Sequence, residues 1–138
     1  MDVVFLVGRI LFGLRFVRSG VGHLVNRDAM VDYAEGTRGL PPRLMVPLAV
    51  VMVLEGVSVI FGIWADLGAL LIVAFIIPTA VIVHDYWTVE DPRMQQIERS
   101  QFMKNLSMAG GALIIFYLYN QGQDLPLSVT DALFGPWG

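Results

Sequence analysis

Four apolar segments, each close to the length of a membrane crossing, constrain the fold of this chain more than any other feature. They are Val3–Val25, Met45–Trp64, Leu67–Val83 and Phe102–Asn120. The hydrocarbon core of a bilayer is ~30 Å thick and an α-helix rises ~1.5 Å per residue, so about 20 residues complete one crossing. Inside lipid, only helices and closed barrels satisfy their backbone hydrogen bonds. The sequence therefore predicts an all-α polytopic membrane protein, a bundle of four transmembrane helices.

The composition also favours a bilayer over a soluble core. The 138 residues are 56% hydrophobic and 15% charged, whereas soluble domains are roughly 45–50% apolar and about 25% charged. The chain has no cysteine, which excludes disulfides, thiolate nucleophiles and Cys-bound zinc or iron–sulfur clusters. Its net charge is −3 and it has no long basic run, so nucleic acid is not an expected partner.

Basic residues in the loops predict the orientation. The basic residues concerned are Arg27, Arg38, Arg43, Arg93, Arg99 and Lys104. All of them lie in, or next to, the two long links at residues 26–44 and 85–101, and the opposite ends of the segments carry no Lys or Arg. Cytoplasmic loops are enriched in these residues. We therefore expect a membrane domain over residues 1–120 of a multi-pass plasma or inner membrane protein. Both termini would be extracytoplasmic, with a tail over 121–138.

One buried ion pair is expected near the middle of the membrane. Arg15 lies near the midpoint of the first segment and Glu55, an isolated acid, near the midpoint of the second. A charged side chain at this depth is costly and rarely faces lipid. Depth alone therefore predicts an Arg15–Glu55 pair. Such a pair can serve helix packing alone, or it can belong to a functional site.

A second group of polar residues shares one membrane level. The ends of the predicted helices place five polar residues at the cytoplasmic end of the bundle, namely His23, His84, Asp85, Lys104 and Asn105. They are far apart in the sequence, so their common depth predicts one polar layer around a cavity. Trp87 follows in the stretch "HDYW", where it could form an aromatic wall of a site or serve as an interfacial anchor, as Tyr and Trp often do.

Five stretches of the chain resemble successive blocks of the DoxX family of small membrane proteins. They are "GRILFGLRFVRSGVGHL", "YAEGTRGLPP", "LEGVSVIFGIWADLGALLI", "VHDYW" and "FMKNLSMAGGALI". The resemblance implies a four-helix bundle. It also implies a link to membrane redox-stress complexes and to quinone-linked sulfur oxidation, in which DoxX-like chains accompany thiosulfate:quinone oxidoreductase.

The resemblance also assigns individual positions. Those that match the family pattern are Arg9, Ser19, Gly20, His23, Glu55, His84, Asp85, Trp87, Lys104 and Asn105. The sequence departs from the pattern at Arg15, at Arg18 and in "EGTRGLPPR", which is longer and more charged. These departures suggest a ligand or partner particular to this chain.

Several kinds of chemistry suit the polar layer. His84 beside Asp85 could relay protons, because histidine titrates near neutrality. A quinone headgroup needs a donor such as His or Lys, an aromatic wall and access from lipid, and all three are expected at this depth. His23 and His84 could instead ligate a haem b iron from two helices, but two lone histidines are weak evidence for haem. No metal site is expected, because the chain lacks the motifs that bind one.

Two functional classes follow from these observations, and whether the chain is an enzyme stays open. One is an accessory subunit of a membrane-bound respiratory or redox complex, whose partners would be lipid and other membrane subunits or further copies of the chain. The other is a redox protein that binds a small quinone-type ligand in the polar layer. The lack of cysteine and of a cofactor motif favours the accessory subunit, and the polar layer favours the ligand.

The tail predicts a short surface helix. Ser128 can act as its N-cap, with Asp131 three residues later as in a capping box and Gly135–Pro136 as a stop. Its apolar residues indicate an ordered segment, which would lie on the outer membrane surface or against a neighbouring subunit.

Overall fold

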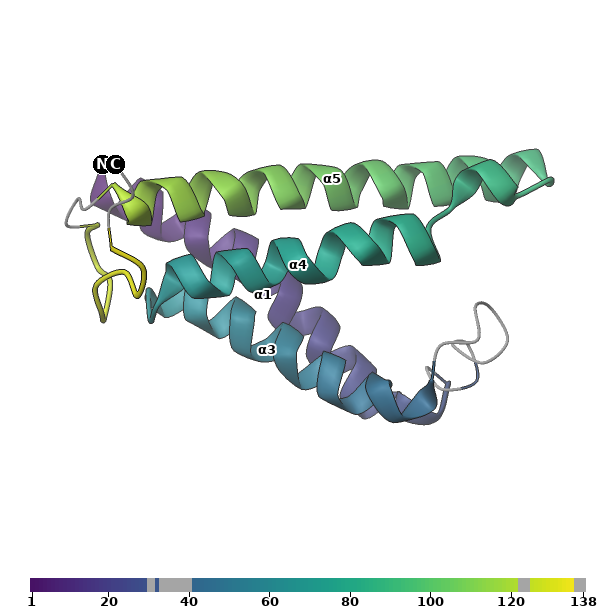
Figure 1. The fold of residues 1–138 in the computed structure, drawn as a ribbon, viewed down its shortest axis with the longest axis horizontal. Helices are drawn as coiled ribbons and strands as arrows, with labels where there is room; N and C mark the ends of the chain where they lie inside the picture. The colour runs from purple at the N-terminus through teal and green to yellow at the C-terminus, as the bar shows by residue number, and fades with distance from the viewer. Residues whose placement is uncertain (30–31, 33–40, 122–124, 136–138) are drawn as a thin grey trace.

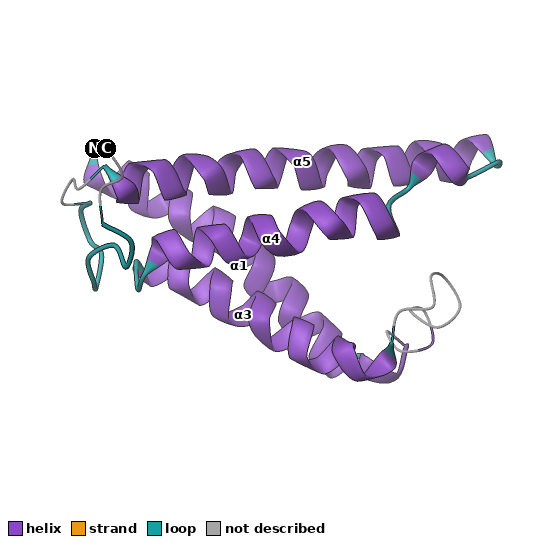
Figure 2. Cartoon of the chain, in the orientation of Figure 1, coloured by secondary structure: helices purple, strands orange, loops and turns teal. Residues whose placement is uncertain are grey.

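The fold is built from long helices. The computed structural model describes residues 1–29, 32, 41–121 and 125–135. Its long helices are α1 (Asp2–Val25), α3 (Met45–Phe61), α4 (Ala65–Val83) and α5 (Pro92–Asn120), and short 3₁₀ helices cover Pro42–Leu44 and Tyr86–Thr88. The described residues contain no strand (Figure 2). The all-α prediction is confirmed for this part of the chain.

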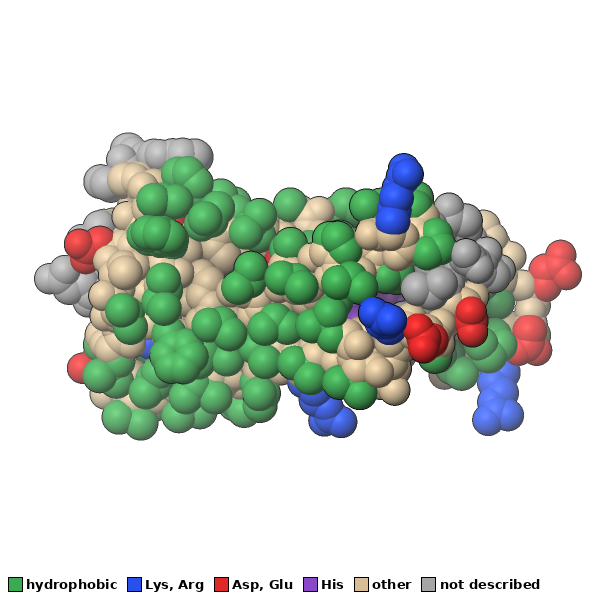
Figure 3. Space-filling model, turned by 90° about the horizontal axis from the view of Figure 1, so that it is seen from below, with side chains coloured by type: hydrophobic (Ala, Val, Ile, Leu, Met, Phe, Trp, Pro, Cys, Tyr) green, Lys and Arg blue, Asp and Glu red, His purple; other side chains and the backbone are tan. Residues whose placement is uncertain are grey.

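Three helical stretches are long and apolar enough to cross a membrane. They are Pro42–Phe61, Ala65–Thr88 and Pro92–Asn120. α1 has 24 residues but carries Asp2 and three arginines, so its composition alone does not make it a crossing. Hydrophobic side chains cover most of the face in Figure 3, and most of the visible Lys and Arg side chains lie in its right half.

The helices form two pairs joined through α3 and α4. α1 packs along α3, α4 packs along α5, and α3 packs on α4. The pairs lie close together at the end that holds the N-terminus and separate toward the other end (Figure 1). The buried core is made mostly of small and branched side chains, with two aromatic rings, namely Phe16, Val59, Ala65, Ala69, Ile72, Ile76, Ala109, Ala112, Ile115 and Tyr119.

Glycines bring the backbones of α1 and α3 into contact. A Cβ atom added to Gly13 would lie 2.6 Å from the carbonyl oxygen of Gly56, and one added to Gly56 would lie 2.7 Å from that of Gly13. Two turns farther along α1, a Cβ on Gly20 would lie 2.6 Å from the carbonyl oxygen of Ala49. Small residues at such crossings allow close van der Waals packing between membrane helices.

The last helix begins ten residues earlier than predicted. The apolar segment starts at Phe102, but α5 starts at Pro92. The Asp91 carboxylate caps it by accepting a 2.9 Å hydrogen bond from the Met94 amide, and Pro92 occupies the first turn, where its missing N–H costs nothing. The expected loop over 85–101 is therefore wrong in its second half, because a polar helix continues the apolar one.

We expect Asp91→Ala to fray the start of α5. Loss of the cap should lower the free energy of unfolding by ~1 kcal/mol and speed amide exchange over residues 93–95. The matched control is Glu90→Ala, which removes a neighbouring exposed carboxylate that caps no helix. Equal effects of the two substitutions on amide exchange would contradict this assignment.

The predicted surface helix in the tail is wrong. Residues 125–135 form turns and bends, and no helix occurs among them. The Val129 amide donates to the Phe61 carbonyl and the Thr130 amide to the Gly62 carbonyl, both at 3.1 Å. These bonds hold Val129 and Thr130 against the α3–α4 corner, so their amides are not available for helical bonds. Pro136, the expected stop, lies outside the described residues.

The tail docks on its own bundle through buried polar side chains. Arg9, only 1% exposed, donates to the Tyr119 hydroxyl, to Ser128 Oγ at 2.7 Å and to the Leu127 carbonyl at 2.6 Å. Asp66 is fully buried and accepts from the amides of Leu133 at 3.0 Å and Phe134 at 2.6 Å. We call Arg9, Asp66, Tyr119 and Ser128 the tail-docking cluster. The tail is thus ordered by contacts within the chain.

Candidate functional site: a polar pocket between the helix pairs

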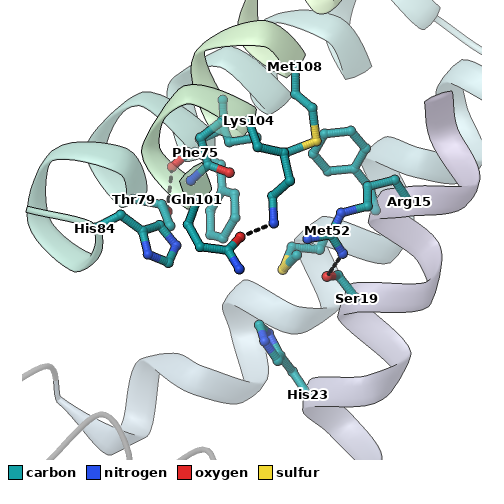
Figure 4. A pocket seen from close by; sticks show the side chains of 13 residues that line it. Arg15, Ser19, His23, Met52, Phe75, Thr79, His84, Gln101, Lys104 and Met108 are labelled. Atoms are coloured by element: carbon teal, nitrogen blue, oxygen red, sulfur yellow. Dashed lines mark hydrogen bonds between the residues drawn. The ribbon is translucent and has the colours of Figure 1, made fainter. Parts of the chain in front are cut away.

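A pocket of about 260 Å³ lies where the two helix pairs separate. All four long helices contribute to it (Figure 4). Its lining residues are Arg15, Phe16, Ser19, His23, Met52, Phe75, Ile76, Thr79, His84, Gln101, Lys104, Asn105 and Met108. The structure therefore brings together His23, His84, Lys104 and Asn105, four of the five residues expected in the polar layer.

Two basic side chains reach the pocket from opposite helix pairs. Arg15 extends from α1 and donates from Nη1 to Ser19 Oγ at 2.7 Å, and Lys104 extends from α5 and donates to Gln101 Oε1 (Figure 4). None of the described lining residues carries a carboxylate. This basic lining favours a ligand that accepts hydrogen bonds or carries negative charge.

His84 is held by a residue on the polar extension of α5. Its Nδ1 lies 2.7 Å from Glu98 Oε2, and both side chains are about one-fifth exposed. The expected relay partner, Asp85, instead accepts from Thr88 Oγ1 at 3.0 Å and does not line the pocket. The His84–Asp85 relay is corrected to a His84–Glu98 pair, because successive residues past a helix end point in different directions.

Trp87 lies beside the pocket and not in it. Its ring packs edge-on against Phe102, with centroids 5.7 Å apart, and against Tyr86 at 5.3 Å. The side chain is 53% exposed, which suits an interfacial anchor. The aromatic wall of the pocket is formed by Phe16 and Phe75 instead.

The expected Arg15–Glu55 ion pair does not form. Glu55 is 1% exposed, and neither of its carboxylate oxygens accepts a hydrogen bond from the described residues, while Arg15 turns along α1 to Ser19. Gly13 and Gly20 set the face of α1 that meets α3, and Arg15 lies about 200° around the helix from Gly13. The two residues match in depth but not in facing direction.

The described residues contain no group of three or more His, Asp or Glu side chains that could hold a metal ion. His23 and His84 both line the pocket, and His84 Nδ1 is engaged by Glu98, which leaves its Nε2 atom for any other partner.

Several pocket residues were not singled out from the sequence. Gln101 and the nearby Glu98 belong to a stretch predicted as loop, so their position on α5 was not foreseen. The Asp91–Pro92 cap is the signal that could have revealed it. Phe75, Met52 and Met108 come from apolar segments, where a residue lining a pocket looks the same as one in the core.

Comparisons with known proteins agree with this architecture. A model of the DoxX family matches residues 4–85, which include all but the first two residues of α1 and the whole of α3 and α4. The chain belongs to the DoxX family. Over 114 residues it is 30% identical to "Inner membrane protein YphA" of Escherichia coli (strain K12), and this covers 82% of the chain and 81% of YphA. No solved structure matches the chain.

Membership in the DoxX family identifies an integral membrane protein. The family match ends at Asp85, so the wall of the pocket that α5 provides lies beyond it. The positions that the resemblance assigned include residues of both polar sites, since Arg9 belongs to the tail-docking cluster and His23 to the pocket.

Proposed function

We propose that this DoxX protein crosses the inner membrane four times and binds a small quinone-type ligand in the polar pocket. The observation that carries the proposal is the pocket, whose lining includes Arg15, Lys104 and two histidines and, among the described residues, no carboxylate. Ionisable residues inside a membrane are costly and usually serve a function. A residue used only for packing would not need to face open space.

Four crossings require α1 to span the bilayer as well. Its 24 residues reach ~36 Å at 1.5 Å per residue, and it packs along α3, itself part of an apolar stretch. Two of its three arginines are accommodated, since Arg9 is buried in hydrogen bonds to the tail and Arg15 faces the pocket, while Arg18 is exposed. These contacts favour residues 1–120 as one membrane domain with the tail docked on it.

The charge distribution supports a cytoplasmic pocket and extracytoplasmic termini. Arg27, Arg43, Arg93 and Arg99 lie toward the pocket end of the helices, whereas the tail end carries Asp2, Asp66 and Asp131. Arg38 lies outside the described residues. Positive residues favour the cytoplasmic side, and YphA is named an inner membrane protein.

A quinone-type head suits the pocket chemically. Its two carbonyl oxygens accept hydrogen bonds, which Arg15 and Lys104 can donate from opposite walls, and Phe75 offers a flat apolar surface. Negative charge that develops on the ring during reduction would be stabilised by both cations. The His84–Glu98 pair supplies a group that can exchange a proton beside the pocket.

The test compares two arginines on adjacent turns of α1. Arg15→Met should weaken the binding of a short-tailed benzoquinone at least about tenfold, because a charge-assisted hydrogen bond contributes about 1.5–3 kcal/mol. Arg18→Met is the control, since Arg18 is exposed and does not line the pocket. Binding would be measured by titration calorimetry on the purified protein. Equal affinities of the two variants would contradict the proposal.

The accessory-subunit role is the second candidate. The resemblance to chains that accompany membrane redox enzymes supports it, and the polar pocket does not exclude it. This role predicts that the purified protein retains no quinone and that it copurifies with a larger redox complex. Quinone extraction from the purified protein distinguishes the two.

A further inference from the structure

A second, apolar cavity adjoins the polar pocket. It measures about 350 Å³ and lies between α3 and α4. Leu48 and Val51 of α3 form one wall, and α4 forms the other with residues that include Leu71, Ala74, Pro78 and Ile82. Leu71, Ala74 and Ile82 are exposed on the molecular surface, so the cavity is a groove. Both helices lie within stretches apolar enough to cross the membrane, so the groove faces lipid.

Two residues belong to both cavities. Phe75 and Thr79, one turn apart on α4, line the groove and also line the polar pocket. The Thr79 hydroxyl donates to the Phe75 carbonyl at 2.8 Å, which turns its polar atom onto the helix backbone. Along this wall of α4, the surroundings change from basic side chains in the polar pocket to apolar side chains in the groove. The Phe75 ring lies at the boundary between the two.

We infer that the ligand of the polar pocket is an amphipathic lipid whose hydrocarbon tail lies in the groove between α3 and α4. This inference rests on the proposed function and specifies it. Arg15 and Lys104 would bind the polar head, and the apolar residues of the groove would bind the tail. The ligand then reaches its site sideways from the bilayer, past Phe75, without passing through water.

The lining residues that the two cavities share favour a hydrocarbon tail over other occupants of the groove. A partner helix docked in the groove would leave the polar pocket without a relation to it, although both share the Phe75 wall. A water-soluble ligand would have no use for a groove that faces lipid. Transfer of a hydrocarbon tail from water into the groove would contribute about 0.8 kcal/mol per CH₂, but transfer from lipid contributes much less. The groove would therefore select the shape of the tail and the direction from which the ligand enters.

The experiment uses two benzoquinones with the same headgroup, one with a single isoprene unit and one with a ten-carbon alkyl tail. Ala74→Trp places a large ring in the groove. It should weaken binding of the long-tailed quinone about tenfold, roughly 1.4 kcal/mol, and leave the short-tailed one unchanged. Leu48→Trp fills the groove from α3 and serves if the first variant fails to fold. The control is Ile77→Trp, an exposed position on α4 that lines neither cavity.

The outcomes separate the inference from the proposed function. If the wild-type protein binds both quinones and the groove variants weaken neither, or weaken both equally, the tail does not lie in the groove and the inference is overturned. If the wild-type protein binds neither quinone, the proposed function itself is overturned. A selective loss of the long-tailed quinone supports both.

Discussion

Gly13→Ala is expected to lower the free energy of unfolding by about 3 kcal/mol, the upper end of the usual cost of overpacking. The added methyl group would lie 2.6 Å from the Gly56 carbonyl oxygen and 2.6 Å from Ile60 Cγ1. The Ile60 side chain can rotate away, but the carbonyl belongs to the backbone of α3. The two helices must therefore separate, and the loss of contact extends along the whole pair.

The same substitution elsewhere on α1 provides the control. A Cβ at Gly22 meets nothing within 4 Å, so Gly22→Ala should raise stability by about 0.5–1 kcal/mol through the better helix propensity of alanine. Gly13→Ala and Gly22→Ala thus differ in sign although the chemical change is identical. Denaturant unfolding of the detergent-solubilised protein measures both. Two stabilising substitutions would show that α1 and α3 do not approach closely.

Arg9→Met is expected to release the tail. The substitution keeps the apolar stem but removes the donors to Tyr119, Leu127 and Ser128, and hydrogen bonds from charged groups contribute about 1.5–3 kcal/mol each. The Tyr119 and Ser128 hydroxyls remain 2.7 Å apart and can bond to each other, so we expect a net loss of ~2–3 kcal/mol. Amide exchange should accelerate at Val129 and Thr130 while the helices keep their protection.

A double-mutant cycle isolates the contact. Ser128→Ala alone should cost ~1 kcal/mol and should cost less when Arg9 is already methionine, because one of the bonds it removes is then gone. Additive effects of the two substitutions, or unchanged exchange in the tail of Arg9→Met, would contradict a tail held by Arg9.

The sequence predicted the parts of this fold that depend on local pattern. Apolar segments of the right length located three of the four long helices to within about three residues at each end, in line with the usual uncertainty of helix boundaries. Helix ends placed at a common depth also predicted the convergence of His23, His84, Lys104 and Asn105. Hydropathy alone does not locate the start of α5, because its first ten residues are mostly polar and only the Asp91–Pro92 cap marks where the helix begins.

Segment lengths and depths do not determine how a helix is rotated about its axis or which residues distant in the sequence come into contact. Depth paired Arg15 with Glu55, but the glycine contacts of α1 turn Arg15 elsewhere. Only the family resemblance assigned Arg9, yet it is among the most deeply buried charged side chains described. Its partners lie 110 to 119 residues later, and no local pattern encodes a contact over that separation.

The partners of Arg9 also bear on how the protein is made. Synthesis proceeds from the N-terminus, so α1 leaves the ribosome long before Leu127 and Ser128 exist. Throughout that interval the guanidinium of the first helix lacks the acceptors that surround it in the finished protein. The environment of Arg9 is thus completed more than a hundred residues later, and a nascent chain stopped before Leu127 would keep an incompletely bonded arginine among its helices, a feature that membrane quality control could recognise.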